Sequence, residues 1–405
     1  MTYCRAKYRL FDPKADFERK AQSIAVGMTV GTWTELPQIK QEEMRKHLGR
    51  VEKVVVFEAE DNPAGERYAD IEIAYPDINF STDLPSLLIT VFGKISMDGR
   101  IKLLDLKLSD PFLSHFPGPK FGISGVRHLL GVEGRPLLMS IFKSVVGYDL
   151  NELKDQFIAQ ALGGVDLIKD DEILFENPLT PIEQRARVCK EAAEEAEKIT
   201  GKKLLYAINL TGPTSKLKDQ ALKAIDAGAS ALLFSVLPYG FDVLHELSSD
   251  PDITVPIAAH PSLAGALYPS QYYGISASLL LGKLMRIAGA DLALFPSPYG
   301  SVVMPREENL AIRNELLTPE LPQLSSFPVP SAGIHPGLVP RILDDFGTDV
   351  VVNAGGGIHG HPGGASSGGR AFLQAIDAAL NKVPLEQAAE SLPELRSALE
   401  LWGGK

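Results

Sequence analysis

Cysteine is scarce in this sequence: only Cys4 and Cys189 occur among 405 residues. The two lie far apart and show none of the short spacings by which cysteines hold a metal ion. A single pair in a chain of this length is no disulfide framework of the kind that supports small secreted domains. This scarcity favours a protein that stays in the reducing cytoplasm.

Long hydrophobic runs and a positive charge excess are absent as well. No apolar stretch reaches the length of about 18 residues that marks a membrane-spanning helix, and the N-terminus lacks the charged-then-apolar plan of a secretory signal. The 40 Lys and Arg residues against 51 Asp and Glu give a net charge of −11. We therefore expect a soluble protein that binds no nucleic acid and no membrane. A phosphorylated small molecule remains possible as a partner, held by local lysines and backbone amides.

The first 120 residues predict a small α+β domain. Strand-like and helix-like segments follow one another in the order β-α-β-β-α-β, the ferredoxin-like arrangement. The strands are expected at Tyr3–Leu10, Val51–Glu58, Tyr68–Tyr75 and Ile101–Leu108, and the helices at Ala15–Gly27 and Leu84–Phe92. Gly93 is placed to end the second helix. The Pro- and Gly-rich run Phe116–Gly122 predicts the linker to a second domain.

Residues 121–405 predict a (β/α)8 TIM barrel with a C-terminal helix. Eight strand-like segments alternate with helix-like segments over about 250 residues, which is the size and rhythm of this fold. The strands are expected at Pro136–Lys143, Val165–Asp171, Leu204–Leu210, Ala231–Leu237, Pro256–His260, Leu292–Pro296, Phe327–Ala332 and Asp349–Asn353. The chain is thus predicted to be α/β, with a ferredoxin-like domain followed by the barrel.

A cluster of charges follows the second barrel strand. The apolar residues of Gly163–Ile168 end in Lys169-Asp170-Asp171-Glu172. Because side chains alternate along a strand, Lys169 and Asp171 are expected on one side, with Glu172 at the start of the loop. Closely packed oxygen ligands suit a hard cation such as Mg²⁺. A solvated loop of alternating charge is the competing interpretation, and this stretch alone does not decide between them.

Other polar residues also fall at predicted strand ends, where barrel enzymes build their active sites. Lys143 ends the first strand, and burying it would be costly without an anionic partner. His260 ends the fifth strand. It could be a core histidine whose hydrogen bonds are all made within the protein, but its position at the strand end favours a hydrogen bond to substrate. Asn209 and Ser331 occupy equivalent positions. The expected convergence of these residues favours a functional role for the acidic cluster.

The loops after the seventh and eighth strands predict a phosphate site. Gly333 lies in the first loop, and Gly355 and Gly356 begin the second. Glycines let backbone N–H groups approach an anion, and barrels commonly hold phosphate at this place. A plain tight turn is the alternative, but it does not need three consecutive glycines. His359 and His361, with His335, could form a metal cluster, but the pair His359 and His361 is interpreted as structural, holding loop carbonyls.

At this point the motifs resemble those of a known family. The segment Gly163–Glu172 resembles the metal motif GGxDxxKDDE of the large subunit of ribulose bisphosphate carboxylase. The surrounding order is similar too, over Gly31–Thr34, Arg135–Leu138, Ser331–His335 and Gly355–Pro362. The similarity covers nearly the whole chain and implies the same two-domain architecture. It also implies that CO₂ carbamylates Lys169, which then binds one Mg²⁺ per subunit together with Asp171 and Glu172.

The departures from the carboxylase pattern are informative. Ser301 follows Gly300 where the carboxylase has the loop-6 lysine that holds the incoming CO₂, and Pro261 replaces an arginine of the second phosphate site. Gly27 stands in place of a catalytic glutamate, and Lys94 in place of an asparagine near the metal. The resemblance therefore implies a monophosphate substrate and no carboxylation. The reaction that remains is the metal-assisted removal of a proton from a carbon beside a carbonyl.

This pattern is similar to the carboxylase-like enolases of bacterial methionine salvage. Those enzymes convert 2,3-diketo-5-methylthiopentyl 1-phosphate to 2-hydroxy-3-keto-5-methylthiopentenyl 1-phosphate. Their lysine in the Phe-Gly-Lys motif, here Lys94, is the general base, although by itself Lys94 looks like an exposed lysine that balances a helix dipole. The resemblance also implies a homodimer, with Thr32 and Trp33 completing the phosphate pocket of a second subunit.

Two other functions stay open beside the enolase. A carboxylase-like isomerase of 5-methylthioribulose 1-phosphate would share the metal, carbamate and phosphate residues. Lys94 in its Phe-Gly-Lys setting favours the enolase over this isomerase. A non-catalytic relative that binds a sugar phosphate has no physical need for an intact Lys169, Asp171 and Glu172.

Overall fold

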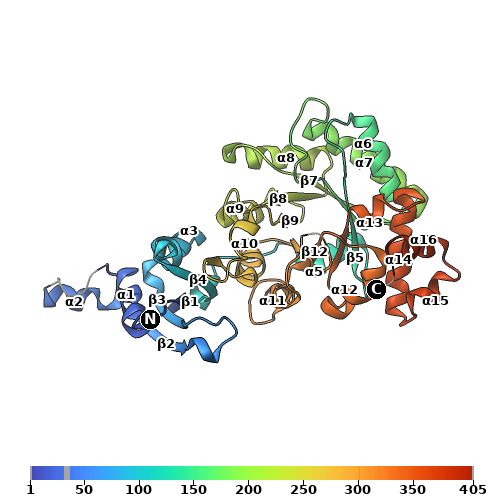
Figure 1. Cartoon of the computed structure of the whole chain (residues 1–405). Helices are drawn as coiled ribbons and strands as arrows, with labels where there is room; N and C mark the ends of the chain where they lie inside the picture. Colours follow the sequence, from blue (N-terminus) through green and yellow to red (C-terminus); the bar gives the residue numbers. More distant parts are fainter. Residues whose placement is uncertain (1, 32–36, 301, 404–405) are drawn as a thin grey trace. The chain divides into compact units, whose positions relative to one another are not determined.

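The computed structural model describes residues 2–31, 37–300 and 302–403, which form two compact units (Figure 1). The first unit comprises Met1–Pro117 together with Leu263–Leu284. The second comprises Gly118–Ser262 and Met285–Lys405. The segment Leu263–Leu284 therefore joins the first unit from within the sequence assigned above to the barrel.

The first unit is built on a five-stranded sheet in the order β10-β4-β1-β3-β2. Its strands are β1 (Tyr3–Phe11), β2 (Arg50–Phe57), β3 (Tyr68–Pro76), β4 (Arg100–Lys107) and β10 (Gly274–Ile275). The predicted ferredoxin-like order is confirmed: β1 runs antiparallel to both β3 and β4, and β3 runs antiparallel to β2. Strand β10 adds a short parallel edge beside β4 that the sequence did not predict.

The helices of the first unit are α1 (Phe17–Gly27), α2 (Gln38–Met44), α3 (Leu84–Leu88) and α4 (Asp110–Leu113). The prediction that Gly93 ends the helix beginning at Leu84 is wrong. Helix α3 continues as a π turn (Ile89–Gly93) and then as a 3-10 turn (Lys94–Met97). Gly93 has a φ of −62°, so it does not provide the left-handed conformation of a glycine cap. Lys94 consequently follows directly on a π turn, a local distortion often found at functional sites.

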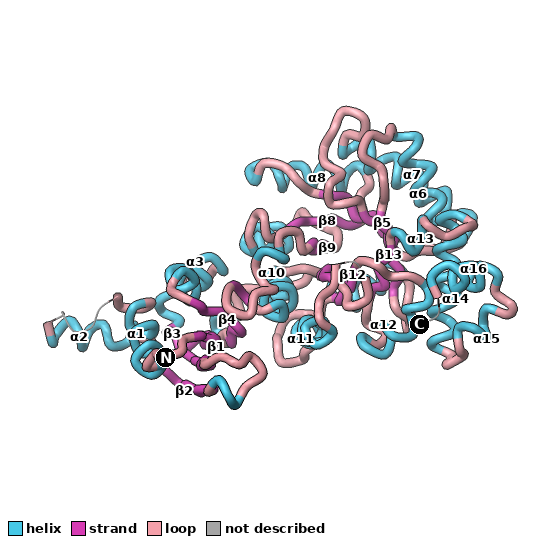
Figure 2. The backbone as a smooth tube through the Cα atoms, in the orientation of Figure 1, coloured by secondary structure: helices cyan, strands magenta, loops and turns pink. Residues whose placement is uncertain are grey.

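The second unit contains the predicted barrel of eight parallel strands (Figure 2). Its strands are β5 (Leu137–Ile141), β6 (Leu167–Lys169), β7 (Leu205–Asn209), β8 (Ala231–Ser235), β9 (Ile257–His260), β11 (Leu292–Pro296), β12 (Phe327–Ser331) and β13 (Val351–Ala354). Hydrogen-bonded neighbours run from β12 through β11, β9, β8, β7, β6 and β5 to β13. Between β13 and β12, the Asn353 amide donates a hydrogen bond of 2.8 Å to the Ser331 hydroxyl. The barrel is thus nearly closed.

Apolar side chains fill the barrel interior, as the buried runs of the sequence predict. Its core includes Met139, Leu167, Leu233, Leu294 and Val329, all at most 2% exposed. The surrounding helices are α5 (Gly122–Leu130), α6 (Leu150–Ala161), α7 (Ile182–Thr200), α8 (Leu217–Ala227), α9 (Phe241–Ser249), α11 (Arg306–Leu317), α12 (Val339–Phe346), α13 (Gly356–His359), α14 (Gly364–Leu380), α15 (Leu385–Ala389) and α16 (Pro393–Trp402). Helix α10 (Leu284–Ala288) bridges the two units along the chain.

Two absences in the described residues bear on the earlier expectations. No helix in this part of the chain is long and apolar enough to cross a membrane. Both cysteines are buried and free, so Cys4 and Cys189 form no disulfide with each other.

Candidate active site

The acidic cluster lies where strand β6 ends and the loop to α7 begins. The strand ends at Lys169, two residues earlier than predicted, so Asp171 and Glu172 belong to the loop. Lys169 is 1% exposed, and its amine donates a hydrogen bond of 3.0 Å to the Asp170 carbonyl. The same amine lies 3.6 Å from a Glu172 carboxylate oxygen. From the end of β5, the Lys143 amine donates a hydrogen bond of 2.8 Å to the Asp171 carboxylate.

Burial controls the charge of this cluster. It lowers the pKa of the Lys169 amine, and the carboxylates of Glu172 and Asp171 oppose that shift only in part. Burial acts in the opposite sense on Glu172, but the charges of Lys169 and Lys143 outweigh it, so the pKa of Glu172 is lowered. The cluster therefore contains a lysine whose proton is readily lost and, beside it, the carboxylate of Glu172, which stays ionised.

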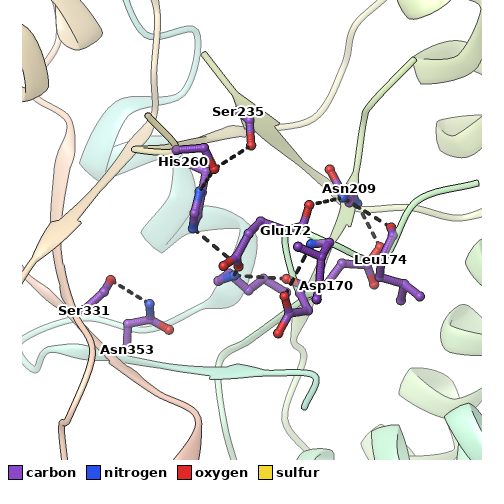
Figure 3. Close-up of polar contacts among 12 residues, drawn as sticks. Asp170, Glu172, Leu174, Asn209, Ser235, His260, Ser331 and Asn353 are labelled. Atoms are coloured by element: carbon purple, nitrogen blue, oxygen red, sulfur yellow. Dashed lines mark hydrogen bonds and ion pairs between the residues drawn. The ribbon is translucent and has the colours of Figure 1, made fainter. Parts of the chain in front are cut away.

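His260, at the end of β9, faces the same cluster (Figure 3). Its Nε2 atom lies 3.5 Å from a Glu172 carboxylate oxygen, and its Nδ1 atom lies 2.9 Å from the Ser262 hydroxyl. Burial lowers the pKa of His260 from 6.5 to about 3, and the charge of Lys169 acts in the same direction. The imidazole is therefore neutral near pH 7 and suited to hydrogen bonding rather than to ion pairing.

The cluster fits a divalent cation once its lysine is modified. Within residues 2–31, 37–300 and 302–403, no three His, Cys, Asp or Glu side chains are grouped to hold a metal ion. The predicted ligands include only two carboxylates, Asp171 and Glu172, and an amine is a poor ligand for Mg²⁺. Reaction of the Lys169 amine with CO₂ would supply a third anionic oxygen group. The lowered pKa of Lys169 favours this reaction, because only a neutral amine attacks CO₂.

The predicted phosphate loops stand beside Lys143. A Cβ atom on Gly355 would come within 2.9 Å of the Lys143 side chain, so the second loop packs directly against this lysine. Gly333 has a φ of +67°, and a Cβ atom there would overlap the Cα of Gly300. Gly333 thus needs glycine for a close backbone approach, a side chain at Gly355 would have to displace the end of Lys143, and Gly356 has open space around it. Lys143 therefore lies between the glycine loop and the carboxylate of Asp171.

His359 and His361 bond to backbone carbonyls, as expected of structural residues. His359 Nε2 lies 2.8 Å from the Ile141 carbonyl, and His361 Nε2 lies 2.9 Å from the Glu394 carbonyl. The ring of His335 stacks on Trp402, with the two ring centres 6.1 Å apart. These contacts join the phosphate loops to β5 and α16.

Lys94 belongs to the first unit and is exposed. It lines a cavity of about 440 Å³ with residues of α1 and of its own turn, among them Ile24, Met28 and Met97. Gly27 also lines this cavity, and a Cβ atom there would meet nothing within 4 Å. Within the described residues, Lys94 thus projects from a turn that borders open space.

Four residues of the resemblance lie outside the described residues: Thr32, Trp33, Thr34 and Ser301.

Asp170, the first of the three acids of the cluster, turns away from Lys143 and Lys169. It is fully buried and accepts a hydrogen bond of 2.6 Å from the Tyr206 hydroxyl. It also pairs with Arg185, at 3.2 Å. The sequence predicts no role for Tyr206 or Arg185, because an arginine within an amphipathic helix and a tyrosine within an apolar strand carry no distinct signal. Alternation along β6 was the available clue, since it sends Asp170 to the side opposite Lys169 and Asp171.

Comparison with known proteins identifies the family. Residues 122–296 and 316–402 match the ribulose bisphosphate carboxylase large chain catalytic domain, and residues 6–113 match its N-terminal domain. A 2,3-diketo-5-methylthiopentyl-1-phosphate enolase of Bacillus licheniformis is 55% identical over 403 residues, covering 100% of this chain and 98% of that protein.

Solved structures agree with this match. A rubisco-like protein (MtnW) from Alicyclobacillus acidocaldarius is 52% identical and superposes with a TM-score of 0.94, covering 99% of this chain and 100% of that one. The octameric ribulose-1,5-bisphosphate carboxylase/oxygenase of Pyrococcus horikoshii is 30% identical, with a TM-score of 0.89 over 99% of this chain and 95% of that one. This chain belongs to the ribulose bisphosphate carboxylase large chain family.

Proposed function

We propose that the protein is a Mg²⁺-dependent enolase of methionine salvage. It converts 2,3-diketo-5-methylthiopentyl 1-phosphate to 2-hydroxy-3-keto-5-methylthiopentenyl 1-phosphate without fixing CO₂. The observation that carries the proposal is the grouping of Lys143, Lys169, Asp171, Glu172 and His260 at the carboxyl ends of barrel strands β5, β6 and β9. The choice of substrate is supported by the name of the 55% identical Bacillus licheniformis protein.

In this proposal Lys169, as its carbamate, holds the cation together with Asp171 and Glu172. When bound, Mg²⁺ acts as a Lewis acid on the two adjacent carbonyl groups of the substrate. The Lys169 amine suits this role because it is buried and its pKa is lowered. Asp171 accepts a hydrogen bond from Lys143, and Glu172 lies within ion-pair distance of Lys169, so each carboxylate faces a lysine of the cluster.

The remaining residues bind and orient the substrate. Backbone N–H groups of Gly333, Gly355 and Gly356 hold the phosphate. Lys143, which packs against Gly355, lies next to this phosphate and stabilises the negative charge that develops on the enolate oxygen. His260, neutral near pH 7, donates or accepts a hydrogen bond at the substrate.

Lys94 is the general base that removes the proton from C1, the carbon beside the phosphate. The first unit of one chain supplies Lys94 to the barrel of a second copy, so the active enzyme is a homodimer. A cytoplasmic location completes the proposal and agrees with two free cysteines.

Replacing Lys94 by Ala tests the base directly. We expect exchange of the C1 proton with solvent deuterium, followed by NMR, to fall about 10²- to 10⁴-fold, which is the usual contribution of a positioned base. Binding of Mg²⁺ should be unchanged, because the ligands belong to the barrel. Lys53→Ala, at an exposed lysine of the same unit, is the matched control. Normal exchange in Lys94→Ala would contradict the assignment.

A further inference from the structure

Asn209, the last residue of β7, is tied to the loop that carries the proposed metal ligands (Figure 3). Its side-chain amide donates hydrogen bonds of 3.0 Å to the Glu172 carbonyl and 3.2 Å to the Leu174 carbonyl. The Thr211 hydroxyl donates a hydrogen bond of 2.9 Å to the Asn209 side-chain oxygen and so orients the amide. Asn209 is only 2% exposed. One buried side chain thus fixes the backbone on both sides of Ile173.

The backbone of Asn209 holds the same loop at a second point. Its N–H group donates a hydrogen bond of 2.8 Å to the Asp170 carboxylate. The other oxygen of Asp170 accepts from the Tyr206 hydroxyl, and Arg185 supplies the compensating positive charge at 3.2 Å. Both oxygens of Asp170 are therefore engaged on the side away from Lys169. A buried carboxylate with this many partners is not free to rotate toward a cation.

We propose that Asn209 and Asp170 are positioning residues that hold the loop 170–174 so that Lys169, Asp171 and Glu172 present their side chains to one metal ion. Three acids follow one another in this loop, and any two of them could reach a cation if the backbone turned. The Asp170 contacts remove the first acid from that competition. The Asn209 contacts fix the peptide units next to Glu172. The inference rests on the metal site of the proposed function, but not on the identity of the substrate.

The test is metal affinity, measured with Mn²⁺ in place of Mg²⁺ by electron paramagnetic resonance at a fixed bicarbonate concentration. Partners that orient metal ligands typically contribute about ten- to a hundredfold to metal affinity. We expect Asn209→Ala to weaken Mn²⁺ binding by about this factor. We also expect the ¹³C carbamate signal of Lys169 to decrease when the protein is loaded with ¹³C-bicarbonate.

Asn309→Ala is the matched control. Asn309 is 1% exposed, and its amide likewise donates to two backbone carbonyls, those of Met304 and Pro305. It should lower the melting temperature to a similar degree but leave Mn²⁺ affinity at the wild-type level. Equal Mn²⁺ affinity in Asn209→Ala and Asn309→Ala would overturn the proposal, because Asn209 would then be merely structural.

A second variant keeps the test open if Asn209→Ala does not fold. Tyr206→Phe removes only the hydroxyl that bonds to Asp170, and it should weaken Mn²⁺ binding several-fold. Wild-type affinity in Tyr206→Phe would overturn the Asp170 part of the proposal. A wild-type protein without bicarbonate-dependent Mn²⁺ binding would refute the metal site and the positioning proposal together. A wild-type protein that binds Mn²⁺ but does not exchange the C1 proton would refute the enolase assignment alone.

Discussion

Single residues in this protein depend on their surroundings for their chemistry. Lys169 is an ordinary lysine in the sequence, but burial lowers its pKa and so raises the fraction of neutral amine near pH 7. Lys94 has the opposite setting, exposed on a short 3-10 turn. The resemblance gives both lysines a role in catalysis, and their environments match two different tasks. A buried amine suits a modified ligand, and an exposed one suits a group that reaches a substrate on another chain.

The pH dependence of CO₂ loading follows from the environment of Lys169. The neutral amine is the reactive form, so loading at fixed dissolved CO₂ should rise as the pH rises through the lowered pKa of Lys169. The charge of Lys143 helps to lower that pKa. Lys143→Met should therefore raise it and move the loading curve to higher pH, as measured by ¹³C NMR of the carbamate.

The control for this shift is Lys223→Met, at an exposed lysine that pairs with Asp219 on α8. Its loading curve should coincide with that of the wild type. Loading that decreases with rising pH, or an unshifted curve in Lys143→Met, would refute the role of the local charges.

At the scale of elements, the phosphate loop depends on one close backbone contact. Gly333→Ala should destabilise the protein by at least the ~1–2 kcal/mol that a left-handed conformation costs a residue with a Cβ atom. It should also weaken binding of inorganic phosphate, because the new methyl group would displace Gly300. Isothermal calorimetry and thermal unfolding measure the two effects.

Gly347→Ala separates backbone strain from the close contact. Gly347 has a similar φ of +73°, but a Cβ atom there would meet nothing within 4 Å. This variant should lose stability and keep its phosphate affinity. Equal phosphate affinity in Gly333→Ala would show that the loop does not form the phosphate site.

The elements themselves were largely predictable, and the exceptions have physical causes. Buried parallel strands are continuous apolar runs, so all eight barrel strands were found with errors of a residue or two at their ends. Strand β10 has only two residues and pairs with β4 from far along the chain, so it leaves no periodic pattern to recognise. The predicted helix end at Gly93 was wrong because glycine ends a helix in this way only when it takes the left-handed conformation, which Gly93 does not.

The candidate site was predictable in its residue types but not in its supporting contacts. Lys143, Asp171 and His260 could be named because polar residues at strand ends converge in a barrel. The bonds from Asn209 to Glu172 and Leu174 join different loops, and no local pattern encodes such a contact. Arg185 is buried on α7 beside Asp170, and nothing in the charge-rich sequence of that helix marks it as a buried residue.

At the scale of the whole molecule, the proposed sharing of the site between two chains makes a specific prediction. Lys94→Ala and Lys169→Ala should each be inactive alone. When the two are unfolded and refolded together in equal amounts, half of the dimers combine one chain of each kind. Each such dimer has one intact site, so roughly a quarter of wild-type activity should return in a two-fold dimer with shared sites. No recovery would mean that Lys94 serves the barrel of its own chain.

Because the segment Leu263–Leu284 belongs to the first unit, that unit is completed only late in the synthesis of the chain. About 170 residues separate the end of β4 from β10, the strand that pairs with Lys102 and Leu103 on its outer edge. At a synthesis rate of roughly 5–20 residues per second, β4 emerges roughly 10–30 s before β10 does. During that interval a ribosome-bound chain carries an uncovered strand edge, which is a template for pairing with neighbouring nascent chains. Slow translation between residues 107 and 274 should therefore raise the aggregation of newly made protein without changing the stability of the finished molecule.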